Sequence, residues 1–170
     1  REAPEIETHL VMSQAARMTI SQETDYDPRD IEALAGVSYR PGDIGAAIAS
    51  GSFETMGMIV APCSIKSLSS IANSFGDDLI TRAADVQMKE GRPVLLMVRE
   101  TPLHLGHLEQ MTQAARIGYI IFPPVPAFYG RPTTIDELVD GTVGRVLARI
   151  GIDNDLYTRW LGMRAAAKSK

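Results

Sequence analysis

Four short runs of apolar residues, separated by longer amphipathic stretches, constrain the possible fold more than any other feature of this sequence. The runs are residues 8–12, 57–61, 94–98 and 119–122, and they show no regular alternation of polar and apolar side chains. Continuous apolar runs of this length are typical of strands that are covered on both faces. Such strands occur in parallel sheets, whose helical connections cover the two faces.

The stretches between the runs have the periodicity of amphipathic helices. We expect helices at residues 14–21, 28–35, 44–49, 65–72, 79–89, 105–117 and 135–150. Alternating strands and helices predict a doubly wound, three-layer α/β/α fold around a parallel sheet, with right-handed crossovers. We expect a single domain over residues 1–162. The basic, small-residue stretch 163–170 is expected to be a flexible tail.

The composition excludes several classes of protein. Charged residues make up 22% of the chain and the formal net charge is -4, which argues against a general nucleic-acid or membrane-surface binder. The single cysteine, Cys63, excludes an internal disulfide and a cysteine-rich metal site. No apolar run approaches the roughly 20 residues of a membrane helix, and no signal peptide is recognisable. We therefore expect a cytoplasmic enzyme or binding domain.

The residues that follow each apolar run are candidates for ligand binding, because open α/β sheets bind ligands beyond the carboxyl ends of their strands. Ser13 follows the first run, and the hydroxyl-rich stretch 62–70 follows the second at the start of a predicted helix. Backbone N–H groups at a helix start suit an anion or the edge of a flavin. Arg99 and Glu100 follow the third run, and a proline-rich loop, 123–129, follows the fourth. These residues alone indicate a site for an aromatic ligand that carries phosphate.

Several stretches of the sequence resemble the UbiX/Pad-type flavin prenyltransferases. The resemblance runs in order and nearly without gaps from about residue 6 to residue 162, and it is carried by residues 7–13, 61–66, 81–86, 98–108 and 123–129. It implies a flavodoxin-like subunit that binds FMN at subunit interfaces and assembles into trimers and then dodecamers. It also implies metal-independent transfer of a dimethylallyl group from dimethylallyl phosphate to N5 and C6 of reduced FMN. The prenylated FMN would then serve a partner decarboxylase of the UbiD type.

The resemblance also implies roles for individual residues. The positions that match flavin contacts are Ser13, Cys63, Ser64, Ile65, Lys66, Ser67 and Arg99. The positions that match contacts to the prenyl phosphate are Arg82, Lys89, Tyr129 and Arg145, whose cations and phenol suit a leaving phosphate. Glu100 matches the catalytic acid/base, and Glu23 and Ser13 match further positions of the catalytic site. A carboxylate beside the flavin could take the C6 proton as the ring becomes aromatic again.

One part of the family pattern has no counterpart in these residues. The family begins with a strand, a glycine-rich turn of the Gly-Ala-Ser-Gly kind and a helix, and that turn wraps the flavin phosphate. The strand would be central in the sheet, so we expect two unpaired strand edges where it is lacking. The residues of the phosphate turn have no numbers in this sequence.

Several residues also allow a plainer interpretation. Cys63 is either a nucleophile at a helix start, where its pKa would be lowered, or a small buried residue under the flavin. His104 and His107 could hold a metal ion or simply pack at a helix start, and the sequence offers no evident third ligand, so we expect no metal site. Without the resemblance, Lys89 and Arg145 would be expected on solvated helix faces.

Two other functions are compatible with the same scaffold. A flavin-dependent cysteine decarboxylase would use FMN in a related fold, but its early helical histidine and its Pro-Ala-Ser/Met-Asn-type motif are not evident. An accessory subunit that only binds FMN would need no second phosphate site. The combination of Lys89, Glu100, Tyr129 and Arg145 argues against it. Turnover of a cysteine-terminated substrate would favour the first alternative. FMN binding without prenyl transfer would favour the second.

Overall fold

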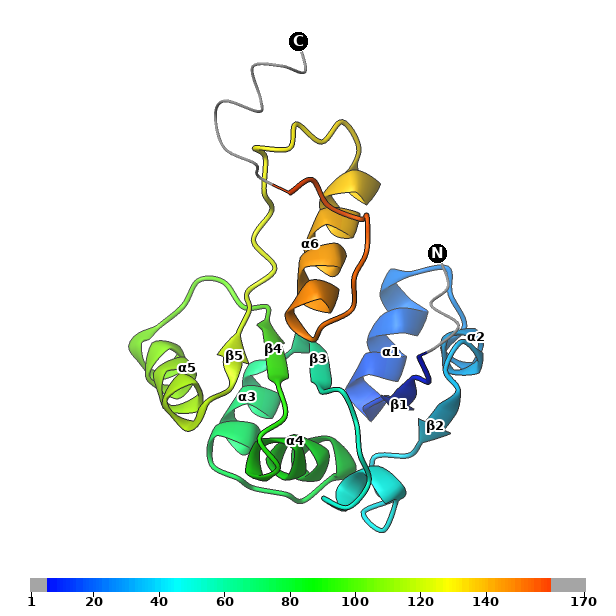
Figure 1. The fold of residues 1–170 in the computed structure, drawn as a ribbon, viewed down its shortest axis with the longest axis vertical. Helices are drawn as coiled ribbons and strands as arrows, with labels where there is room; N and C mark the ends of the chain where they lie inside the picture. Colours follow the sequence, from blue (N-terminus) through cyan, green and yellow to red (C-terminus); the bar gives the residue numbers. More distant parts are fainter. Residues whose placement is uncertain (1–5, 160–170) are drawn as a thin grey trace.

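Parallel strands and flanking helices make up the computed structural model, which describes residues 6–159 (Figure 1). The strands are β1 (His9–Val11), β2 (Val37–Tyr39), β3 (Met58–Cys63), β4 (Val94–Val98) and β5 (Ile120–Ile121). The helices are α1 (Gln14–Glu23), α2 (Pro28–Ala33), α3 (Ile65–Ala72), α4 (Leu79–Lys89), α5 (Leu105–Ile117) and α6 (Ile135–Arg149), with a short 3-10 helix η1 (Ala47–Ala49). The predicted tail, 163–170, and the end of the predicted domain, 160–162, lie outside the described residues.

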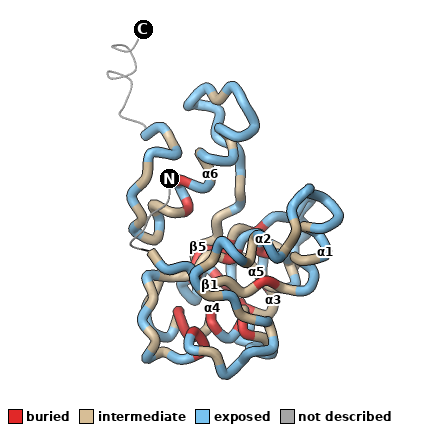
Figure 2. Tube along the Cα trace, turned by 90° about the vertical axis from the view of Figure 1, so that its right-hand side faces the viewer, coloured by how far each residue is buried: buried red, intermediate tan, exposed pale blue. Residues whose placement is uncertain are grey.

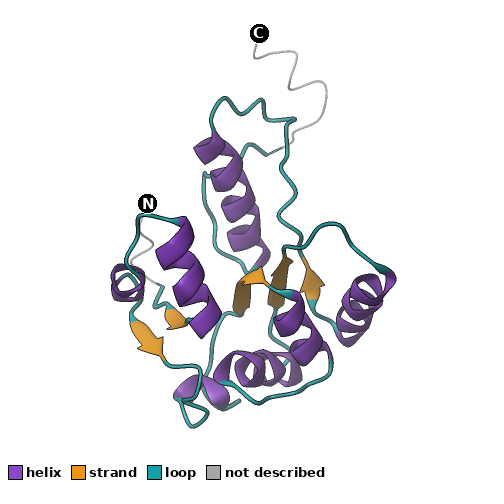
Figure 3. Cartoon of the chain, turned by 180° about the vertical axis from the view of Figure 1, so that it is seen from behind, coloured by secondary structure: helices purple, strands orange, loops and turns teal. Residues whose placement is uncertain are grey.

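Every strand pairing in this part of the chain is parallel, as the apolar runs predict. The strands fall into two sheets: β1 pairs with β2, and β3, β4 and β5 lie in that order in the second sheet. Within residues 6–159, β1 and β3 therefore each keep one edge without a partner strand. Seen from behind, α6 rises from the strands on the side opposite to α3 and α4 (Figure 3). The parallel α/β class is confirmed.

Side-chain caps fix where the main helices begin. The N-cap residues accept a hydrogen bond from a backbone N–H of the first turn, which has no partner inside the helix; they are Ser13 of α1, Ser64 of α3, Asp78 of α4 and Thr134 of α6. Ser13 and Ser64 come within two residues of the ends of β1 and β3. The caps therefore hold the first turns of α1 and α3 at the carboxyl ends of these strands.

The main core lies between the three-stranded sheet and the helices α3, α4 and α5. Leu96 of β4 and Leu68 of α3 are fully buried, and Ala84 of α4 and Ala114 of α5 pack in the same cluster. Buried residues gather around these elements, whereas α1 and α6 are mostly exposed or half-buried (Figure 2). The carboxyl ends of β3, β4 and β5 therefore lie next to the most buried part of the structure. None of the described helices has the length and apolar character needed to cross a lipid bilayer.

The turn between α4 and β4 is tied to the chain that precedes β3. The guanidinium of Arg92 donates to the carbonyl of Phe53 at 2.8 Å and to the carbonyl of Gly51 at 2.9 Å. Hydrogen bonds from a charged donor contribute more than neutral ones. These bonds fix the end of α4, and with it Lys89, against the segment around Gly51.

Candidate active site

The carboxyl ends of β3, β4 and β5 bring three of the predicted segments to one edge of the sheet. Arg99 donates its backbone N–H to the carbonyl of Cys63 at 3.3 Å. Phe122 in turn donates to the carbonyl of Leu96 at 2.9 Å, so the loop after β5 leaves the sheet beside the end of β4. This edge is where an open parallel sheet is expected to hold a ligand.

The first turn of α3 presents hydroxyl groups and backbone donors at this edge. Ser64 Oγ accepts the N–H of Ser67 at 3.2 Å, and the two hydroxyl oxygens are also 3.2 Å apart. Ser64 and Lys66 are exposed, and Ile65 and Ser67 are half-buried. The N–H groups and the positive end of the helix dipole favour an anionic or electron-rich group. The turn therefore fits the polar edge of a flavin ring.

Cys63 lies beneath this turn as a packed residue. It ends β3, its exposed fraction is 0%, and its thiol faces the carbonyl of Ser64 at 3.7 Å. Burial raises the pKa of the Cys63 thiol from 9.0 to about 12. The thiolate is the reactive form, so a thiol that stays protonated at neutral pH is a poor nucleophile. The structure therefore favours packing under a ligand over nucleophilic catalysis for Cys63.

We expect Cys63 to resist alkylation in the folded protein at mildly alkaline pH. Its pKa is raised to about 12, and each pH unit below a pKa lowers the thiolate fraction tenfold. Iodoacetamide at pH 9 should therefore modify the folded chain at least ~10²-fold more slowly than the chain in guanidinium chloride. A mass-spectrometric time course reports this directly, because the chain has one cysteine. Equal rates in the two conditions would show that the thiol is accessible and ionised in the fold.

Arg99 and Glu100 follow β4, and both side chains are exposed at the strand edge. One carboxylate oxygen of Glu100 accepts the backbone N–H of Thr101 at 3.1 Å, which orients the group at the start of the loop before α5. A carboxylate in this place can take a proton from a ligand bound along the edge. The backbone of Arg99 lies beside the end of β3 through its bond to Cys63, and its exposed guanidinium adds positive charge to this strand edge.

A cavity of about 670 Å³ lies between the loop after β5, helix α6 and the chain that follows α6. It brings together Tyr129 and Arg145, two of the residues expected to contact the prenyl phosphate. A phenol and a guanidinium that face one cavity can bind phosphate through charge-assisted hydrogen bonds. Apolar side chains such as Val125 and Leu138 line the same cavity and suit a short hydrocarbon group.

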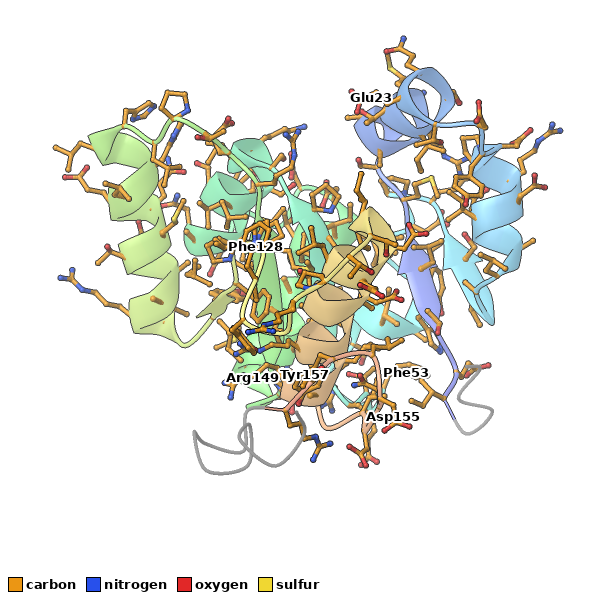
Figure 4. The ribbon with its side chains drawn as sticks, turned by 90° about the horizontal axis from the view of Figure 1, so that it is seen from above. Glu23, Phe53, Phe128, Arg149, Asp155 and Tyr157 are labelled. Atoms are coloured by element: carbon orange, nitrogen blue, oxygen red, sulfur yellow. The ribbon has the colours of Figure 1, made fainter. Side chains whose placement is uncertain are left out.

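The sequence analysis did not anticipate residues 155–158 in this cavity, where they form part of its wall. Asp155 and Tyr157 of this stretch are labelled in Figure 4, at the side of the molecule where α6 ends. Gly151, with φ 87°, turns the chain back after α6. A glycine after a helical pattern is a recognisable stop signal. No local pattern, however, indicates which surface the returning chain will cover.

Helix α4 separates two of the expected phosphate contacts. Arg82 lies in its first turn, with its guanidinium 3.9 Å from Asp85, whereas Lys89 is its last residue. Because α4 connects two parallel strands, it runs back along the sheet, and its last residue lies near the amino end of β4. Glu100 follows the carboxyl end of β4, whose five residues span about 16 Å. Lys89 and Glu100 therefore lie at opposite edges of the sheet in one subunit.

Lys89 is held away from the strand edge by its neighbours. Its Nζ lies 2.7 Å from a carboxylate oxygen of Glu90. The pair lies against Gly51, where an added Cβ would come within 2.8 Å of the Lys89 ammonium and closer still to the Glu90 carboxylate. The ion pair lowers the pKa of Glu90 through its hydrogen bond to Lys89. Within this subunit, Lys89 thus stays apart from Glu100.

Ser13 and Glu23 lie at opposite ends of α1. Ser13 caps the helix and accepts the N–H of Ala16 at 3.1 Å, beside the carboxyl end of β1. Ten helical residues, about 15 Å in length, lead to Glu23, which is exposed. Glu23 lies at the periphery, well away from Phe128 and Tyr157 (Figure 4). In this subunit Ser13 is placed at a strand end, as expected, and Glu23 is not.

His104 and His107 pack against each other at the start of α5, with ring centroids 3.5 Å apart. Residues 6–159 contain no group of three or more histidine, cysteine, aspartate or glutamate side chains placed to hold a metal ion. The close approach of the two rings fits a packed pair.

Comparison with known proteins identifies the family. The sequence matches the Flavoprotein family over residues 2–147. The flavin prenyltransferase UbiX of Escherichia coli K12 is 58% identical over 164 residues, which cover 95% of this chain and 87% of that protein. The chain belongs to the UbiX family of flavin prenyltransferases. A mitochondrial flavin prenyltransferase of Saccharomyces cerevisiae is 52% identical over 160 residues, which cover 94% of this chain and 66% of that protein.

Solved structures of UbiX-type proteins share the fold. The crystal structure of AnUbiX in complex with FMN and dimethylallyl pyrophosphate has a TM-score of 0.90 and 48% identity, covering 94% of this chain and 85% of that one. A dodecameric FMN-dependent UbiX-like decarboxylase of Escherichia coli O157:H7 has a TM-score of 0.90 and 49% identity, with coverage of 94% and 86%. The FMN-dependent cysteine decarboxylase SpaF, at 19% identity and a TM-score of 0.52, shares the fold alone. The flavodoxin-like fold and the UbiX/Pad-type resemblance are confirmed.

Proposed function

We propose that this protein is a flavin prenyltransferase, which joins a dimethylallyl group to N5 and C6 of reduced FMN. The observation that carries the proposal is the pairing of two half-sites, a strand edge that fits a flavin and a cavity that holds Tyr129 and Arg145. A protein that only carries FMN has no need for the second half-site, the cavity with Tyr129 and Arg145. The complex of AnUbiX with FMN and dimethylallyl pyrophosphate, at 48% identity, supports a prenyl phosphate as the donor.

The flavin half-site lies at the carboxyl ends of the strands. Reduced FMN, when bound, supplies the nucleophilic N5 and C6. The first turn of α3 and the end of β4 would hold its ring, with backbone and hydroxyl donors available to its polar edge. The residues that we assign to FMN binding are Ser13, Cys63, Ser64, Ile65, Lys66, Ser67 and Arg99.

The donor half-site neutralises and orients the leaving phosphate. The bond between the dimethylallyl C1 and the phosphate oxygen would break as N5 bonds to C1, N5 would lose its proton to the departing phosphate, and negative charge builds up on that phosphate. Ring closure would follow when C2 of the alkene takes a proton and C3 bonds to C6. Arg145 and Tyr129, together with Arg82 and Lys89, stabilise this charge, which is the largest catalytic contribution that fixed donors can make. Glu100 takes the proton that C6 loses. Glu23 lies away from the strand end within one subunit, so we assign it a supporting acidic role at the site of a neighbouring copy.

The position of Lys89 supports a site that is shared between subunits. Since Lys89 and Glu100 lie at opposite edges of one subunit, Lys89 reaches the donor of a neighbouring copy. The dodecameric UbiX-like relative, at 49% identity, supports a closed homo-oligomer, which we assign as a dodecamer built from trimers. Large exposed apolar side chains are available for such contacts, among them Leu34, Leu105 and Ile135. The prenylated FMN then passes to a UbiD-type decarboxylase.

The test is an anaerobic assay of the purified chain with reduced FMN and either dimethylallyl phosphate or dimethylallyl pyrophosphate. We expect the flavin to gain the mass of one C5 unit with at least one donor. FMN binding without a mass gain on either donor would contradict prenyl transfer and favour an FMN carrier. Decarboxylation of a cysteine-terminated peptide in place of prenyl transfer would favour the cysteine-decarboxylase alternative.

A further inference from the structure

The chain that follows α6 folds back along the helix as an ordered segment. Gly151 turns the chain, and Ile152 donates its N–H to the carbonyl of Leu147 at 3.1 Å. Residues 152–158, the return segment, then run beside α6 in the opposite direction (Figure 1). The return segment thereby reaches the cavity that holds the two phosphate-binding side chains.

One side chain ties the return segment to α6. The Nδ2 group of Asn154 donates to the carbonyl of Gly144 at 3.0 Å and to the carbonyl of Ile152 at 3.1 Å. Its Oδ1 accepts the N–H of Leu156 at 3.1 Å. Both donors and the acceptor of this half-buried amide are therefore used, and one of the bonds crosses from the segment to the helix.

The close contact between the return segment and α6 requires a glycine. Gly144 is buried, and a Cβ on it would lie 2.6 Å from Asn154 Oδ1, 2.8 Å from Leu156 Cβ and 2.9 Å from Tyr157 Cδ1. All three distances are too short for real atoms. A glycine inside a helix is unfavourable relative to alanine, and this approach of the chain is a physical reason for having one. The next residue of α6 is Arg145.

The return segment also adjoins the loop that carries Tyr129. A Cβ on Gly130 would lie 3.9 Å from the side chain of Thr158, which is ordinary contact distance. The segment thus packs on α6 at the residue before Arg145 and lies close to the loop at the residue after Tyr129. The backbone beside Arg145 is therefore held by this seven-residue stretch, and the backbone beside Tyr129 lies next to it.

We propose that Asn154 and Gly144 are positioning residues, which hold the return segment in place and so set the geometry in which Tyr129 and Arg145 bind the prenyl phosphate. The inference rests on the proposed function and concerns the donor half-site alone. Side chains that are held in their binding geometry lose less conformational freedom when the ligand binds. The FMN contacts lie at the strand edge, so loosening the return segment should weaken donor binding and leave FMN binding intact.

The test is a titration of the prenyl donor with variants of these two residues. Asn154→Ala and Gly144→Ala are each expected to raise the KM for the donor about tenfold and to lower kcat as well. The kcat falls because Tyr129 and Arg145 also stabilise charge on the departing phosphate. The Kd of FMN should stay within about twofold of wild type. Asn154→Asp can still accept from Leu156 but has no N–H to donate to Gly144, and it should match Asn154→Ala. Alanine is a better helix former than glycine, so a raised KM in Gly144→Ala cannot come from a melted α6.

Gly45→Ala is the matched control, because no atom lies within 4 Å of the added Cβ, and its KM should equal that of wild type. An unchanged donor KM in Asn154→Ala and Asn154→Asp would overturn the proposal while wild-type turnover still supported the proposed function. A parallel loss of FMN affinity would overturn it too, since the damage would then be general. Should Gly144→Ala fail to fold, the two Asn154 variants decide the question.

Discussion

Glu100→Gln is expected to slow prenyl transfer by about 10²–10⁴-fold while the protein still binds FMN. Glutamine keeps the shape of glutamate, and its amide oxygen can still accept the N–H of Thr101, a bond that is 3.1 Å long in the wild type. It cannot accept the proton that leaves C6. The substitution therefore removes one chemical step and leaves the backbone around the strand edge as it was.

The measurement is single-turnover prenyl transfer under anaerobic conditions, read by flavin mass, beside a titration of FMN by fluorescence. Glu109→Gln is the matched control, since Glu109 is exposed on α5 and has no assigned role. Its turnover should equal that of wild type. Unchanged turnover in Glu100→Gln would remove Glu100 from the acid/base role.

Helix positions could be read from the sequence wherever caps and apolar periodicity agreed. The predicted ranges 65–72, 79–89 and 105–117 are also the observed bounds of α3, α4 and α5. Each begins after a residue in extended conformation, and Ser64 and Asp78 cap their helices with a side chain. The predicted helix at 44–49 is instead the three-residue η1, because Gly45 and the turn before it leave too few residues for an α-helix.

Strand β2 was missed because it gives no apolar run. Val37–Tyr39 has three residues, with the polar Ser38 exposed at its centre. Its partner β1 was visible as a run, and the parallel pairing of the two is a tertiary result. The sequence could likewise indicate which residues follow each strand, because parallel strands must end together. It could not show that Lys89 faces the opposite edge, since that depends on how α4 crosses the sheet.

The cavity around Arg145 also could not be predicted from the sequence. A basic side chain at this position is compatible with a solvated helix face, and Arg145 is indeed exposed. The return segment forms part of the wall of the cavity that Arg145 lines. It packs on Gly144 through contacts between residues about ten positions apart. In the sequence, a glycine inside a helical pattern indicates only a less stable helix. The structure shows which segment packs too closely against it for a side chain to fit.

Two inactive variants are expected to restore activity when they are mixed in one oligomer. Lys89→Ala removes a cation from the donor half-site, and Glu100→Gln removes the acid/base, so each alone should lose about 10²-fold or more in rate. If each site takes Lys89 from one subunit and Glu100 from another, random mixing leaves both residues intact in about one quarter of the sites. The mixture should then recover roughly a quarter of the wild-type rate.

Co-expression of two differently tagged variants, with two-step purification and native mass spectrometry, gives oligomers of known subunit content. Arg99→Ala mixed with Glu100→Gln is the matched control. Arg99 and Glu100 follow the same strand, so each site takes both from one subunit, and every subunit in this mixture lacks one of them. That pair should stay inactive. If the mixture of Lys89→Ala and Glu100→Gln stays equally inactive in verified mixed oligomers, the shared site is wrong. Lys89 would then be a surface partner of Glu90, at the 2.7 Å separation seen within the subunit, and the donor phosphate would depend on Arg82, Tyr129 and Arg145 alone.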